Sequence, residues 1–277
     1  MENVGGQAVV EGVMMRSKTR VATAVMILKE KKIKIKVTRL KDPPKLFKLP
    51  IIRGIYTLVD SLILGTKALI WSSNQNLEDA EKIKTSEMVL TFLFSFALGL
   101  FLFLGIPYLI TKFVFGKGLW FSLMEGLIRV SLLLAYLGII SFSSEVKKLF
   151  QYHGAEHKVI NCYEAGEEVT VKNVKKYPTL HTRCGTSFIF IVLIFSIITF
   201  SFLEIGWMRL FWKFLLIPVV AGFSYEFLKL SDRFRTNLLM KILIWPGLML
   251  QKITTKEPDD QQIAVSIKAW ERATSQP

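Results

Sequence analysis

Long apolar runs constrain this chain more than any other feature of its sequence. They cover residues 88–110, 119–142, 187–205 and 207–228. A helical run of about 20 mostly apolar residues matches the hydrocarbon thickness of a bilayer. Hydrophobic residues make up 51% of the 277 residues, which is high for a soluble domain. The sequence therefore predicts a mainly α-helical membrane protein with about four transmembrane helices.

The distribution of basic residues predicts how these helices are oriented. The formal net charge is +14, and lysine and arginine concentrate before residue 88, between 143 and 185, and after 228. Loops rich in these residues stay on the cytoplasmic side. We therefore expect a multi-pass protein of the inner or plasma membrane, with both termini and the loop 143–186 in the cytoplasm. In that compartment Cys162 and Cys184 are expected to be reduced.

Residues 1–48 are polar and basic and carry strand signals. The stretches "VATAVMIL" (21–28) and "KIKIKV" (32–37) flank the polar "KEKK", and the second alternates lysine with isoleucine or valine. This alternation is typical of a half-buried strand, so the pair predicts a β-hairpin. The lysine face favours a solvated sheet edge over a surface for RNA or anionic lipid. We expect a small β-containing cytoplasmic domain here.

The other segments follow from helical periodicity. Residues 49–86 predict an amphipathic interfacial helix and a linker, because Asp60 would be costly inside a bilayer. Residues 87–250 form the expected transmembrane bundle, in which 238–250 is too short for a fifth span and favours an interfacial or re-entrant segment. Residues 251–277 predict a cytoplasmic tail with a short surface helix after "EPDD".

The stretch "YHGAEHKVINCYEAGEE" (152–168) carries the clearest chemical signal. All three histidines and both cysteines of the chain lie between positions 153 and 184. If the second span continues as a helix past residue 142, His153 and His157 lie on one face, one turn apart. The order His-x-x-Glu-His matches the inverzincin motif. It predicts two imidazole ligands for one metal ion, with Glu156 as general base.

A catalytic zinc site needs a third protein ligand and an open position for water, whose pKa the metal lowers to about 7. The candidates are His181 and Cys184 in "HTRCGTSF" and Glu226 in "GFSYEFLKLSD". Glu164 returns to the face of the two histidines seven residues after His157. The choice of third ligand stays open, as do a redox or haem site and a purely structural cluster. For Cys162 alone, we favour the interpretation as a small buried residue of a helix over that of a ligand.

Glu125 and Arg129 are a separate pair inside the second predicted span. They lie four residues apart, so they could form an ion pair on one helix face. Ionisable residues inside a membrane helix are also candidates for a transport path. The other spans contain few polar residues, which argues against a transporter.

Several motifs together resemble one family. They are "GGQAVVEGVMMR", "YHGAEHKVINCYEAGEE", "HTRCGTSF", "GFSYEFLKLSD" and "PGLMLQKITTKEPDDQQIAVSI". The combination is similar to the YqhQ-like bacterial membrane proteins, which have relatives in plastids and are sometimes described as predicted metal-dependent enzymes. The resemblance covers nearly the whole chain and leaves the reaction open. The matching motif positions include His153, Glu156, His157, Cys162, Glu164, His181, Arg183, Cys184 and Glu226.

These observations predict a divalent metal, zinc by its ligand types, on the cytoplasmic side of the bundle. A metal-dependent hydrolase or peptidase acting at the membrane is the leading hypothesis. The alternative is a non-enzymatic assembly or scaffold factor, with a four-ligand structural zinc knuckle and a basic domain that binds an anionic partner. Expected partners are membrane lipid and either another protein or a second copy of the chain. Nucleic acid is not expected.

Overall fold

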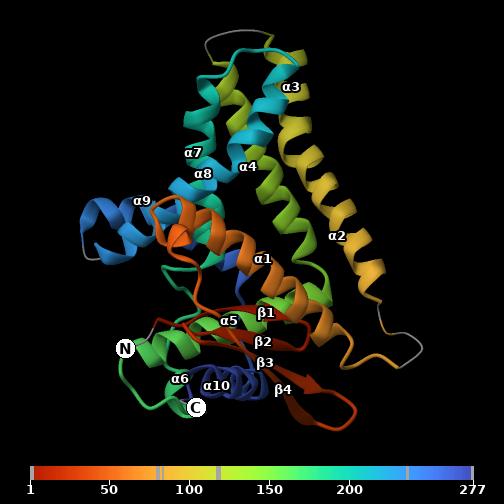
Figure 1. Cartoon of the computed structure of the whole chain (residues 1–277), viewed down its shortest axis with the longest axis vertical. Helices are drawn as coiled ribbons and strands as arrows, with labels where there is room; N and C mark the ends of the chain where they lie inside the picture. The colour runs from red at the N-terminus through yellow and green to blue at the C-terminus, as the bar shows by residue number, and fades with distance from the viewer. Residues whose placement is uncertain (1–2, 79–81, 83, 117–119, 235–236, 276–277) are drawn as a thin grey trace.

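Two parts of the chain are stacked along its long axis: a bundle of upright helices, and a module built on an antiparallel sheet (Figure 1). The computed structural model describes residues 3–78, 82, 84–116, 120–234 and 237–275. The bundle consists of α2 (Thr85–Leu100), the π-helical turn η3 (Phe101–Gly105), α3 (Ile106–Phe115), α4 (Phe121–Ile140), α7 (Gly185–Ser201) and α8 (Met208–Arg233). Helix α9 (Leu238–Thr254) projects from its side (Figure 1).

The second part is called the polar module below. It contains β1 (Gly5–Val9), β2 (Gly12–Arg16), β3 (Arg20–Ile27), β4 (Lys32–Arg39), α5 (Ser144–Glu164), α6 (Val171–Val174) and α10 (Asp260–Thr274). A short 3-10 turn, η1 (Lys45–Lys48), leads from it to α1 (Ile52–Ser73). Helix α1 runs obliquely between the polar module and the bundle (Figure 1).

Among the described residues, four helices are long and apolar enough to cross a membrane: α1, the continuous stretch Val89–Phe115, α4 and α8. The number of candidate spans agrees with the prediction, but one of the four helices is a different one. The predicted span 187–205 forms α7, which has 17 residues and is shorter than the other four. Helix α1, expected as an interfacial helix, takes its place in the set. The expected start of the second span at residue 119 lies outside the described residues.

Helix α1 contacts both parts of the molecule, the sheet of the polar module and α8 of the bundle. Asp60, which is costly in a membrane span, pairs with Arg16 of β2 at 2.6 Å. Ala68 packs into a small core with Val9 and Val25 of the sheet. Near the start of the helix, the backbone at Gly54 lies so close to α8 that an added Cβ would meet backbone atoms within about 3 Å. The ion pair with Arg16 gives the half-buried Asp60 a counter-charge within an apolar helix.

The sheet has the order β1-β2-β3-β4, with every neighbour antiparallel. The predicted hairpin is confirmed as β3 and β4, with Ile27 opposite Lys32 and the lysines of β4 exposed. The hairpin of β1 and β2 was not predicted. Its turn contains Glu11, which adopts a φ of 53°, a value more usual for glycine or asparagine, and Gly12 follows it.

The core of the polar module combines residues that are far apart in sequence. Val13 and Met15 of β2 point to the same side as Ala22 and Ala24 of β3, and α5 and α10 cover that side. The C-terminal helix is confirmed and begins at the expected motif, with Asp259 as a cap that accepts from the N–H of Gln262. It is not a surface helix, because Ile263 and its neighbours are buried in this core.

Helix α5 does not continue the second span. A turn at residues 141–143 separates α4 from α5, so the expected end of the span near residue 142 agrees with the structure, and the continuous helix considered for the histidines does not form. The turn directs α5 across the sheet (Figure 1). Gly154 lets the segment before α10 cross α5 closely, since an added Cβ would lie 2.1 Å from the carbonyl oxygen of Lys256. The break thus places the histidines inside the polar module.

Replacing Ile263 by alanine is expected to destabilise the polar module. The side chain is 0% exposed in the core, and such truncations cost about 2–5 kcal/mol. Thermal unfolding of the purified chain in detergent, followed by near-UV circular dichroism, measures the effect. Gln261→Ala on the exposed face of the same helix is the control. Equal melting temperatures for the two variants would contradict the buried position of α10.

Candidate metal centre

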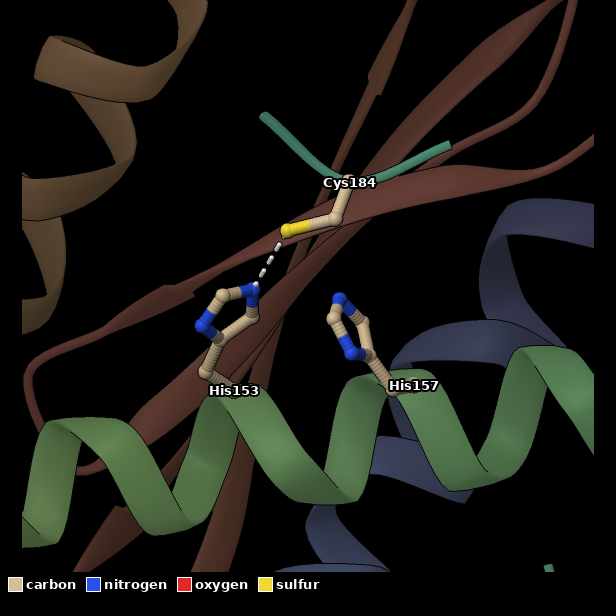
Figure 2. Close-up of side chains that lie close together, drawn as sticks. All are labelled: His153, His157 and Cys184. Atoms are coloured by element: carbon tan, nitrogen blue, oxygen red, sulfur yellow. Dashed lines mark hydrogen bonds between the residues drawn. The ribbon is translucent and has the colours of Figure 1, made fainter. Parts of the chain in front are cut away.

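Helix α5 presents His153 and His157 side by side, as their spacing of four residues requires. The ring centroids lie 4.4 Å apart, and Figure 2 shows both rings rising from the same face of the helix. His157 is only 1% exposed. Burial lowers its pKa, which favours the neutral imidazole that a metal requires.

Backbone carbonyls hold both rings through the same nitrogen. His153 Nδ1 donates to the carbonyl oxygen of Thr254 at 2.9 Å, and His157 Nδ1 donates to that of Thr179 at 2.5 Å. A carbonyl can only accept, so each Nδ1 carries the proton and each Nε2 keeps its lone pair. Metal-binding histidines are commonly oriented in this way. Neither carbonyl could be identified from sequence, because the interaction uses no side chain of Thr179 or Thr254.

Cys184 brings a thiol to the two free nitrogens. It precedes α7 as its N-cap, and its sulfur accepts from the backbone N–H of Thr186 at 3.4 Å. The sulfur lies 3.2 Å from His153 Nε2, as the dashed line in Figure 2 marks. One ligand atom from each of His153, His157 and Cys184 lies within 4.8 Å of the other two. Donors around tetrahedral zinc lie roughly 3–4 Å apart, so small side-chain rotations would close this group on an ion.

Glu156 lies beside the group and is 4% exposed. Burial raises the pKa of its carboxyl, while the two histidines at 153 and 181 and the backbone N–H of Gly6 oppose that shift. Gly6 belongs to β1, and an added Cβ there would lie 2.5 Å from the carbonyl oxygen of Met14. A glycine is therefore needed where the N-terminal strand reaches this carboxylate.

His181, Glu164 and Arg183 form a network next to the three ligand candidates. The ring of His181 lies 5.8 Å from that of His157. Its Nδ1 accepts from the N–H of Arg183 at 3.3 Å, and its Nε2 faces Glu164 at 3.5 Å. Arg183 also pairs with Glu164 and contacts Asp232 at 3.8 Å. This network holds His181 near the group but outside it.

Two other candidate residues are not brought to the group. The carboxylate of Glu226 forms a two-point ion pair with Arg53 and accepts from the N–H of Ile51. It therefore joins α8 to the start of α1. Cys162 is buried in the core of the polar module, and burial raises the pKa of its thiol. Both cysteines are free.

Gln251 of α9 positions the loop that carries His181 and Cys184. Its side chain accepts from the N–H of His181 at 2.9 Å, and donates to the carbonyl of His181 and to the Ser187 hydroxyl, both at 2.8 Å. Gln251 is fully buried. The only sequence signal was a lone amide at the end of an apolar run, so this residue was missed.

A cavity of about 690 Å³ opens beside the group; we call it the polar cavity. Its wall includes all three ligand candidates, Glu156 and Arg183. The sheet contributes the backbone of β1 to the same wall. A small molecule in this cavity would meet the metal candidates and the carboxylate together.

Glu125 and Arg129 belong to a separate buried cluster in the bundle. Arg129 donates to Glu125 at 3.1 Å and to the carbonyl oxygen of Phe103, in the π-helical turn, at 2.8 Å. Arg209 and Lys213 of α8 also pair with Glu125. Arg209 and Lys213 lie four residues apart inside an apolar run, and this pattern could have identified both cations from the sequence. The predicted pair is thus part of a larger ionic network that joins α4 to α8.

Comparisons with known proteins agree with the resemblance in the motifs. A family model described as "Protein of unknown function (DUF1385)" matches residues 49–276. The chain is also similar to the uncharacterized protein YqhQ of Bacillus subtilis (strain 168), with 38% identity over 293 residues, which cover 96% of this chain and 90% of that protein. No solved structure matches the chain.

Replacing Gln251 by alanine is expected to make the thiol of Cys184 more accessible. The change leaves buried groups of His181 and Ser187 without their partner, at a cost of about 1–3 kcal/mol each. Since Cys184 is 6% exposed in the intact structure, its maleimide labelling should accelerate. Gln75→Ala, whose amide caps α1 far from this site, is the control. Unchanged labelling in Gln251→Ala would show that the amide does not hold the loop.

Proposed function

We propose that this chain, which belongs to the family described as protein of unknown function (DUF1385), is a membrane-associated, metal-dependent hydrolase. One observation carries the proposal. His153 and His157 both direct Nε2 lone pairs at the sulfur of Cys184, with each Nδ1 held by a backbone carbonyl. A cysteine nucleophile activated by histidine would need only one imidazole. The second imidazole aimed at the same point supports a metal ion.

The ligand types favour zinc. Thiolate and imidazole are common zinc ligands, with bonds of about 2.3 Å and 2.0–2.1 Å. A set of three protein ligands leaves the fourth tetrahedral position open, as in catalytic sites. A structural knuckle would need a fourth ligand such as His181. Both ring nitrogens of His181 already face other groups, Arg183 and Glu164, which supports an open position beside the polar cavity.

Glu156 is the proposed general base. It lies between the two histidines in sequence and lines the same cavity. In the hydrolysis of an ester or amide, the oxygen of water bonds to the carbonyl carbon, and the bond from that carbon to the leaving group breaks. Glu156 takes a proton from the water and returns it to the leaving group. A bound zinc ion supplies Lewis acidity, which lets water react at neutral pH.

We further propose that the polar module faces the cytoplasm. The support is the concentration of lysine and arginine in the segments that build it and in the strand β4, whose lysines are exposed. In this orientation both chain ends lie on the cytoplasmic side, where the thiol of Cys184 would stay reduced.

Zinc is expected to bind in stoichiometric amount and to depend on the three ligand candidates. His153→Ala, His157→Ala and Cys184→Ala should each lose zinc, as measured by elemental analysis of the detergent-purified chain after zinc loading. Cys162→Ala is the matched control and should retain it, because that thiol lies in the core.

Zinc retained by Cys184→Ala would contradict the assigned site. His181→Gln tests the alternative function, because His181 is not part of the open site. Loss of zinc in that variant would indicate a closed, four-ligand structural knuckle and would argue against a hydrolase.

Glu156→Gln is expected to keep zinc and lose hydrolysis. Removal of a general base lowers the rate by about 10²–10⁴-fold, while the metal ligands stay in place. The rate of p-nitrophenyl acetate hydrolysis by the zinc-loaded protein measures this. Glu167→Gln, an exposed residue after α5, is the matched control. A Glu156→Gln variant with the unchanged rate would show that Glu156 is not the base.

A further inference from the structure

Two cavities meet at the candidate metal centre. Besides the polar cavity, a second cavity of about 520 Å³ has His153 and Cys184 in its wall; we call it the apolar cavity. Arg183 also lines both spaces, as do Gln7, Thr57, Ser61 and Tyr225. Glu156 and His157 line the polar cavity but not the apolar one. The sulfur and one imidazole therefore lie where the two cavities adjoin.

The apolar cavity lies between helices that have the composition of membrane helices. Leu58 of α1, Phe188 and Ile189 of α7 and Leu228 of α8 line it, together with Phe150 of α5. Helices α1 and α8 are two of the four long enough to cross a membrane. The membrane-helix candidates therefore supply apolar side chains to this wall, while Gln7, Thr57, Ser61 and Tyr225 supply polar ones.

The outer wall of the apolar cavity is partly open. Ile189 lines the cavity, yet it is 46% exposed on α7. Apolar side chains exposed on such helices are stable next to lipid and costly next to water. Ile189 therefore offers an exposed apolar side chain at the cavity wall, which a hydrocarbon chain could contact.

From this juxtaposition, and resting on the proposed hydrolase function, we infer that the substrate is a membrane-embedded amphiphile with an acyl chain. The chain lies in the apolar cavity, the bond to be hydrolysed lies at His153 and Cys184, and the polar remainder lies in the polar cavity beside Glu156. Hydrolysis proceeds with the same balance as above, and water is the second reactant. A fully water-soluble peptide would leave the apolar cavity without a matching group.

Acyl hydroxamates of increasing length test this inference. The hydroxamate group binds an open position on a metal, and the chain reports on the apolar cavity. Acetohydroxamate, octanohydroxamate and dodecanohydroxamate are titrated into the full-length, cobalt-loaded chain in detergent, with the visible spectrum of cobalt as readout. Burial of each methylene is worth about 0.8 kcal/mol, so affinity should rise by up to about fourfold per added methylene.

Substitutions in the wall of the apolar cavity distinguish binding of the acyl chain there from its partition into detergent. Leu58→Trp and Ile189→Trp should fill the apolar cavity and abolish the gain with chain length, but leave acetohydroxamate binding unchanged. Leu62→Trp, one turn along α1 and exposed, lines neither cavity and should keep the gain. Partition into detergent is equal for all variants, so their differences report the cavity.

Two kinds of failure are distinguishable. If the wild-type chain binds all three hydroxamates equally, or if both tryptophan variants keep the full gain, the acyl-chain site is overturned and the hydrolase proposal stands. If acetohydroxamate does not change the cobalt spectrum, the open metal position is overturned, and the inference falls with it.

Discussion

The arrangement of the candidate site depends on two hydrogen bonds from imidazole to backbone. The carbonyls of Thr179 and Thr254 hold Nδ1 of His157 and His153, and so direct both Nε2 atoms to Cys184. These carbonyls belong to a loop and to the last turn of α9. The site is therefore complete only when this loop, which also carries Cys184, and α9 meet on α5, and Gln251 joins the two through its buried amide.

The rest of the fold supports this meeting point. The sheet is covered by α5 and α10 on one face and by α1 on the other, so β1 can bring the N–H of Gly6 to Glu156. Helix α1 is paired with the sheet through Asp60 and with Glu226 of α8 through Arg53. These ion pairs connect the polar module to the bundle, with the metal candidates at the junction.

Local patterns predicted local structure well. The alternation in 32–37 predicted a real strand of a hairpin, and Asp259 predicted a real helix start, because both signals act between near neighbours. The spacing of His153 and His157 likewise placed them on one helix face. The turn at 141–143 and the hairpin around Glu11 were missed. Ser141 and Ser143 lie in the turn and Gly12 follows Glu11, but single serines and glycines also occur inside helices and strands, so they do not fix where an element ends.

By itself the sequence determined the helical class, the family, and the clustering of histidine and cysteine, which are residue types that can bind a metal, since composition and short spacings are properties of the chain alone. Only the tertiary structure decided which thiol or carboxylate joins the histidines. It selected Cys184, engaged Glu226 with Arg53, and engaged His181 with Glu164 and Arg183. The physical reason is that a ligand set requires lone pairs to converge within a few ångströms, and backbone carbonyls from distant segments set that direction.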